Sequence, residues 1–133
     1  GDMPYIIKAG HVRQAETAAS LIDAVAPFIN ALAMTNSVAS TVQADDGRML
    51  FDGQPRGICG DATRSASVEQ TRLFSKLVGE RKLNIDLIGV GGVSTATHAR
   101  EYLAAGAHAV HIATAAMVDP LVACRIRAEL TAV

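Results

Sequence analysis

The 133-residue sequence has no excess of charge of either sign. It contains 12 Lys and Arg residues against 13 Asp and Glu residues. This near balance, without a basic cluster, offers little electrostatic attraction for nucleic acid or for an anionic membrane surface. The longest uncharged stretches are broken by polar residues and form no apolar span of the roughly 20 residues that a membrane helix needs. We therefore expect no nucleic-acid partner and no membrane association.

Cysteine is scarce, and histidine is poorly placed for metal binding. The two cysteines, Cys59 and Cys124, have neither metal-site nor disulfide spacing. His108 and His111 are close in sequence, but residues three apart on a strand face opposite sides. No carboxylate joins them at ligand spacing. We expect no metal site, and a reducing, cytoplasmic location.

Apolar residues, in contrast, make up 50% of the chain, which is enough to build the core of one domain over residues 1–133. Four short runs are rich in Ile, Val, Leu and Ala and show no polar alternation. This pattern is typical of parallel strands that are covered on both faces. The predicted strands are residues 5–8, 31–35, 86–90 and 109–114.

Amphipathic segments lie between and after these runs. Each places its apolar residues on one stripe at helical spacing, and Ser94 or Thr95 is a natural N-terminal cap for the third helix. Strands that alternate with helices imply right-handed crossovers and a parallel sheet. The predicted fold is a (βα)4 half TIM barrel, with helices at residues 14–28, 67–81, 95–105 and 120–130.

One connection is much longer than the others. Residues 36–66 exceed an ordinary strand-to-helix loop, and loops of this length usually bind or cover something, or are disordered. Within the loop, a small hairpin could turn at Asp45-Asp46-Gly47. We expect residues 39–65 of this loop to be mobile without ligand.

Ligands of parallel α/β sheets bind outside the carboxyl ends of the strands. Gly91 and Gly92 stand at one such end, where glycine lets the backbone approach a phosphate and the next helix offers free N–H groups. Ala113 and Thr114 stand at the next strand end and add donors. The alternative is that the two glycines only form a tight, well-packed turn.

The residues at the remaining strand ends, taken one at a time, do not distinguish a ligand contact from a structural role. Lys8 ends an apolar strand, and its ammonium either meets a ligand or reaches solvent. Asn36 and Ser37 either contact a ligand or form a turn. Cys59 lies in a glycine-rich segment with no evident base beside it, so we expect no catalytic thiol there.

Taken together, the strand ends resemble the C-terminal half of the dihydroorotate dehydrogenases, which are FMN-dependent (βα)8 barrels. The similarity covers nearly the whole chain in the same order. It rests on four segments: "YIIK", "TNS", "RGICG" and "LIGVGGVSTATHAREYLAAGAHAVHIATAAMVDP".

The resemblance implies a role for each matched residue. Lys8 would lie near the N1/O2 edge of the flavin, and Asn36 with Ser37 would contact a pyrimidine such as orotate. Gly57 and Gly60 would let their loop pass close to the flavin. The FMN phosphate would accept hydrogen bonds from the backbone at Gly91, Gly92, Ala113 and Thr114.

The chain also departs from the family pattern. Ala113 replaces a usual glycine, His111 a usual glutamine, and Cys59 a usual serine or glycine. Ala9-Gly10 follow the lysine in place of the usual Leu and Ser or Thr. The catalytic base of the family lies in the first half of the barrel, which this sequence lacks, so we assign no catalytic residue.

The predicted function is FMN or phosphate-ligand binding by a dihydroorotate dehydrogenase-like half barrel. Two alternatives stay open: a non-catalytic half-barrel assembly module, and another phosphate-binding barrel activity such as an isomerase or aldolase. A four-stranded half barrel leaves an apolar inner face and two unpaired edges. We therefore expect a homodimer or a partner half barrel. A rewound, flavodoxin-like sheet with helices on both faces is the competing architecture.

Overall fold

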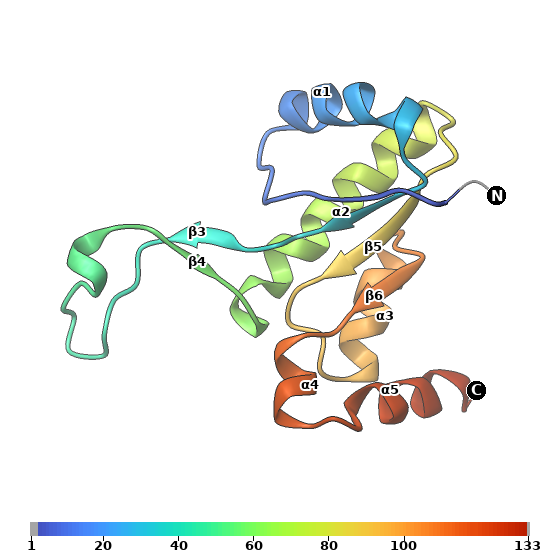
Figure 1. Ribbon diagram of the computed structural model, residues 1–133. Helices are drawn as coiled ribbons and strands as arrows, with labels where there is room; N and C mark the ends of the chain where they lie inside the picture. Colours follow the sequence, from blue (N-terminus) through green and yellow to red (C-terminus); the bar gives the residue numbers. More distant parts are fainter. Residues whose placement is uncertain (1–2, 133) are drawn as a thin grey trace.

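The computed structural model describes residues 3–132, and its centre is a sheet of four parallel strands. The strands lie in the spatial order β1-β2-β5-β6 (Figure 1). The parallel α/β sheet predicted from the sequence is confirmed. The strands are β1 (Ile6–Lys8), β2 (Ala31–Met34), β5 (Asp86–Val90) and β6 (Ala109–His111).

The last strand is shorter than expected. It ends at His111, because Thr114 begins a short helix, α4 (Thr114–Val118), that the sequence analysis missed. The other helices agree with their predicted positions to within three residues at each end. They are α1 (Ala15–Val25), α2 (Arg64–Glu80), α3 (Ala96–Ala104) and α5 (Val122–Thr131).

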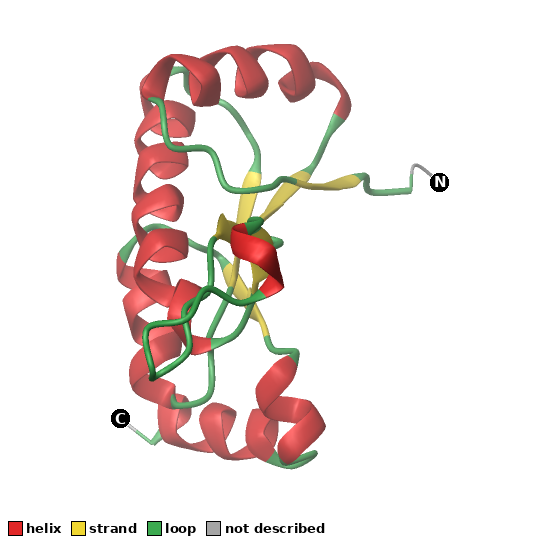
Figure 2. Ribbon diagram, turned by 90° about the vertical axis from the view of Figure 1, so that its left-hand side faces the viewer, coloured by secondary structure: helices red, strands yellow, loops and turns green. Residues whose placement is uncertain are grey.

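The helices α1, α2 and α3 lie on the same side of the sheet (Figure 2). Ile22 and Phe74 from this layer bury their side chains against Leu32 and Leu87 of the sheet. A second cluster packs Tyr102 of α3 against Val122 and Ile126 of α5. This one-sided arrangement is that of a partial barrel and differs from the two-sided flavodoxin-like alternative.

The other side of the sheet, which we call the open face, carries a smaller apolar cluster. Ala31, Ala33 and Ile88 are buried there, with Val90 beside them. Ile88 thus faces this open side, whereas Ile7 and Leu32 pack on the helix side. The register explains the difference, because Ile88 pairs with Ala33, and Ala33 in turn pairs with Lys8.

The long connection forms an arm that projects from the body (Figure 1). Its base is an antiparallel hairpin of β3 (Val38–Ser40) and β4 (Arg56–Ile58). The turn expected at residues 45–47 is present, closed by hydrogen bonds between Ala44 and Arg48 and between Gly47 and Ala44. The sequence analysis missed β3 and β4, and the expected mobility of the arm stays a prediction.

Within residues 3–132, no helix combines the length and the apolarity needed to cross a membrane.

Candidate functional site

A pocket of about 710 Å³ lies at the carboxyl ends of the four parallel strands. This volume is in the range of pockets that hold small molecules or cofactors. Residues that follow different strands converge on it, as expected for a parallel α/β sheet. Seven of the residues predicted from the sequence line the pocket: Lys8, Asn36, Gly60, Gly91, Gly92, Ala113 and Thr114.

Two predicted residues lie elsewhere. Ser37 and Gly57 are not among the residues that line the pocket. They face each other at the base of the arm, where a Cβ on Gly57 would lie 3.0 Å from the Ser37 Oγ. Close packing against Ser37 therefore accounts for a glycine at position 57, and the predicted approach of Gly57 to a ligand stays a prediction.

Lys8 and Asn36 form a polar pair in the pocket. Because β1 and β2 are neighbours, their ends bring the Lys8 Nζ within 3.1 Å of the Asn36 Oδ1, to which it donates. Arg125, which also lines the pocket, pairs with Asp119. Of the Lys and Arg side chains that line the pocket within residues 3–132, Arg125 has a carboxylate partner and Lys8 has none.

Free backbone donors occupy the ends of β5 and β6. Within residues 3–132, the N–H groups of Gly91, Gly92, Ala113 and Thr114 donate no hydrogen bond to the protein. Backbone N–H groups at the start of helices are a common binding site for phosphate. Ala113 has a φ of −122°, outside the left-handed region that favours glycine, so its φ does not call for the usual glycine.

Thr35 is a pocket residue to which the sequence analysis assigned no role. Its side chain is 2% exposed, and its Oγ1 has no hydrogen-bond partner among the described residues. A buried hydroxyl without a partner is energetically costly, so such groups usually meet a ligand or water. Thr35 directly precedes Asn36, and that position at a strand end was the available signal.

The glycines at the end of β5 are also required by the protein itself. Gly91 and Gly92 have φ angles of 136° and 65°. A Cβ on Gly91 would lie 2.8 Å from the Ser67 Oγ, and one on Gly92 would lie 2.7 Å from the Asp61 Cα. Close packing therefore accounts for both glycines, and whether they also approach a phosphate stays a prediction.

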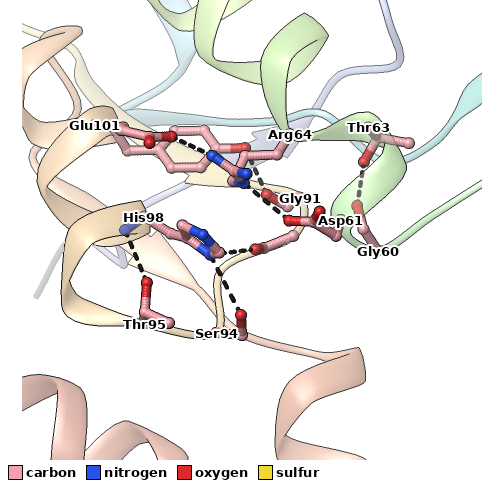
Figure 3. Close-up of polar contacts among 11 residues, drawn as sticks. Gly60, Asp61, Thr63, Arg64, Gly91, Ser94, Thr95, His98 and Glu101 are labelled. Carbon is pink, nitrogen blue, oxygen red and sulfur yellow. Dashed lines mark hydrogen bonds and ion pairs between the residues drawn. The ribbon is translucent and has the colours of Figure 1, made fainter.

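Behind this turn, a charged cluster joins α2 to α3 (Figure 3). The Arg64 guanidinium bonds Asp61 at 2.9 Å and Glu101 at 2.6 Å. The hydrogen bond and the charge of Arg64 lower the pKa of the Asp61 carboxyl below its ordinary value. Both carboxylates partly neutralise the charge of Arg64, so the cluster offers little attraction for an anion. Its main effect is to hold the turn in place between α2 and α3.

Comparison with known proteins settles the family. The family model described as dihydroorotate dehydrogenase matches residues 5–133. The chain belongs to the dihydroorotate dehydrogenase family. The resemblance noted in the sequence is thereby confirmed.

Individual relatives agree with this assignment. The chain is 33% identical over 102 residues to the catalytic subunit of dihydroorotate dehydrogenase B (NAD(+)) from Bacillus caldolyticus, covering 76% of this chain and 31% of that protein. It is 28% identical over 127 residues to the corresponding subunit from Bacillus thuringiensis strain Al Hakam, covering 92% and 40%. The chain therefore spans well under half the length of these relatives.

Solved structures show the same fold. Dihydroorotate dehydrogenase from Eimeria tenella, in complex with ferulenol, superposes with a TM-score of 0.76 at 22% identity. The match covers 94% of this chain and 32% of that one. The ligand-free form of the same protein gives a TM-score of 0.75. The chain thus has the fold of part of a dihydroorotate dehydrogenase barrel.

Proposed function

We propose that this chain is the FMN-binding half of a dihydroorotate dehydrogenase-type barrel. The observation that carries the proposal is the composition of the pocket. It combines the Lys8 ammonium, the buried Thr35 hydroxyl without a partner, and free backbone N–H groups at two neighbouring strand ends. These groups suit a ligand that has a polar aromatic ring at one end and a phosphate at the other.

In this proposal each end of the pocket has a separate task. The N–H groups of Gly91, Gly92, Ala113 and Thr114 donate to the phosphate, whose charge also favours the start of a helix. Lys8 would offer its ammonium to the flavin ring, where reduction builds negative charge. Asn36, fixed by Lys8, keeps its amide N–H groups for a pyrimidine substrate.

When bound, FMN would supply the hydride acceptor for the oxidation of dihydroorotate to orotate. That reaction also needs a base to remove the neighbouring proton. The family resemblance places this base in the first half of the barrel, and the chain covers 31–40% of the relatives described above. We therefore propose that this chain binds the cofactor and positions the substrate, and that further strands are needed for turnover.

The test is a titration of the purified chain with FMN, followed by flavin absorbance and fluorescence. We expect binding, and we expect Gly92→Asp to abolish it, because the new side chain adds a like charge and its Cβ forces the turn that carries the phosphate donors to move. Lys8→Met should weaken binding of reduced FMN more than of oxidised FMN, because the reduced form carries the charge that Lys8 meets.

Three outcomes would count against the proposal. If Gly92→Asp binds FMN as tightly as the parent, the phosphate site lies elsewhere. A parent chain that takes up neither FMN nor phosphate would favour the non-catalytic assembly module. Binding of simple sugar phosphates without any binding of flavin would favour another phosphate-binding barrel activity.

A further inference from the structure

Two side chains of α3 hold carbonyl groups of the turn that follows β5. The Tyr102 hydroxyl donates to the Gly91 carbonyl at 2.7 Å. The His98 Nδ1 lies 3.1 Å from the Gly92 carbonyl and 3.2 Å from the Ser94 Oγ (Figure 3). A carbonyl can only accept, so Nδ1 must carry the hydrogen of the bond to Gly92.

These two bonds fix the direction of the neighbouring N–H groups. The peptide bonds of this turn are trans. In a planar trans peptide the C=O and the following N–H point to opposite sides. With the carbonyls of Gly91 and Gly92 held on the side of α3, the N–H groups of Gly92 and Val93 point away from it. Neither N–H has an acceptor within residues 3–132, and both residues line the pocket.

Both of these side chains belong to α3, which holds their backbone in place. Tyr102 is fully buried, and its ring packs so closely on Gly89 that a Cβ there would lie 2.2 Å from the ring. Burial raises the pKa of Tyr102, so its hydroxyl keeps the proton that it donates. His98 lies in the first turn of α3, where its backbone N–H donates to the Thr95 Oγ1 at 3.1 Å.

We propose that Tyr102 and His98 are positioning residues, which direct the N–H groups of Gly92 and Val93 toward the phosphate of a bound phosphate monoester. The proposal rests on the pocket of the proposed function and deepens it. An independent observation also points to a ligand in the same pocket, namely the buried Thr35 hydroxyl without a partner. If one of these bonds is removed, the peptide group that it holds becomes free to rotate. The N–H of that peptide group then no longer points preferentially into the pocket.

The experiment compares four variants of the full chain: Tyr102→Phe, His98→Ala, His98→Asn and the control Thr97→Ala. Thr97 is an exposed neighbour on α3. Each protein is titrated with FMN, with riboflavin, which lacks the phosphate, and with inorganic phosphate. Amide signals of Gly92 and Val93 are followed by nitrogen-15 NMR during the phosphate titration, and thermal melts establish that each variant is folded.

In the parent, phosphate should shift both amide signals. Tyr102→Phe and His98→Ala should each weaken phosphate and FMN binding by about tenfold, the typical effect of one lost hydrogen bond to a charged group. Riboflavin affinity should stay within about twofold, as general damage to the fold would not spare it. His98→Asn should restore most of the loss, because its amide N–H lies near the position of Nδ1. Thr97→Ala should match the parent.

The proposal is overturned if phosphate leaves the two amide signals in place, or if both variants bind FMN and phosphate as the parent does. An equal loss of riboflavin affinity would also overturn it. If the parent binds phosphate at these amides but no flavin, the proposed function fails while the positioning role stands. If Tyr102→Phe does not fold, the proposal is judged by the two His98 variants. It then stands only if His98→Asn restores the phosphate affinity that His98→Ala loses.

Discussion

The Thr35 hydroxyl is buried in the pocket and has no partner among the described residues. In Thr35→Val a methyl group of similar size replaces it, so we expect the ligand-free protein to gain about 1 kcal/mol in free energy of unfolding. The matched control is Thr71→Val, also buried, whose Oγ1 donates to the Ser67 carbonyl at 2.9 Å. That variant should lose about 1 kcal/mol. Urea unfolding measures both.

The same substitution should weaken FMN binding, since the hydroxyl is one of the groups offered to the ligand. Stability would then rise while binding falls, as is common when a polar group is kept for function. If Thr35→Val loses as much stability as Thr71→Val, the hydroxyl already has a partner and its proposed role is wrong.

Alanine substitutions at Gly92 and Gly47 distinguish two costs of replacing a glycine, which are backbone strain and the displacement of packed neighbours. Both have positive φ, 65° and 84°, but a Cβ on Gly92 would lie 2.7 Å from the Asp61 Cα, whereas a Cβ on Gly47 would meet nothing within 4 Å. Gly47→Ala should cost about 1 kcal/mol of unfolding free energy from strain alone. Gly92→Ala should cost about 1–3 kcal/mol more, because a backbone atom must move. If urea unfolding shows that both variants lose the same unfolding free energy, the turn at Gly92 can accommodate a Cβ at no cost beyond backbone strain.

At this scale the sequence predicted the glycine turn but not what surrounds it. Gly91 and Gly92 could be assigned because they end an apolar run and precede a helix. That they pack against Ser67 and Asp61 depends on how α2 approaches β5, which no local pattern records. Whether the Thr35 hydroxyl finds a hydrogen-bond partner likewise depends on the whole fold. The role of Gly57 stays a prediction, because a glycine in a loop can serve internal packing as readily as a ligand.

Among the elements, those with a clear period were predictable. The four parallel strands and the four longer helices have apolar runs or stripes that show directly in the sequence. The strands β3 (VAS) and β4 (RGI) mix small, polar and apolar residues, so no apolar run marks them, and α4 has only five residues, too few for a helical stripe. The end of β6 was placed too late because "HIAT" continues its apolar run, while the chain already turns into α4.

The cap of α3 provides a test at the level of one element. Thr95 stands at the N-cap with extended φ and ψ, and its Oγ1 accepts from the His98 N–H, as expected for Ser94 or Thr95. Thr95→Ala should cost about 1 kcal/mol of unfolding free energy. Thr97→Ala, two residues later in the same helix, should cost little, since alanine is the better helix former. Urea unfolding that ranks the two variants in the opposite order would contradict a capping role.

For the whole molecule, the open face poses the main physical problem. Helices cover one side of the sheet, while the other exposes Ile6, 53% accessible, beside the small cluster of Ala31, Ala33 and Ile88. β1 and β6 are the outer strands of the described sheet, so each has one unpaired edge. Exposed apolar surface and free edges both favour association.

We propose that a second copy can complete the barrel when no other half is present. A two-fold axis along the barrel would pair β6 of one copy with β1 of the other and close eight parallel strands. Sedimentation at micromolar concentration should then give twice the mass of one chain. Ile6→Glu, on the open face, should yield monomers, whereas Leu103→Glu, an exposed apolar residue of the helix layer, should not. A parent that sediments as a monomer with a cooperative melt would contradict the dimer. The closing strands would then have to come from a longer chain or a different partner, because an open parallel sheet leaves its inner face in water.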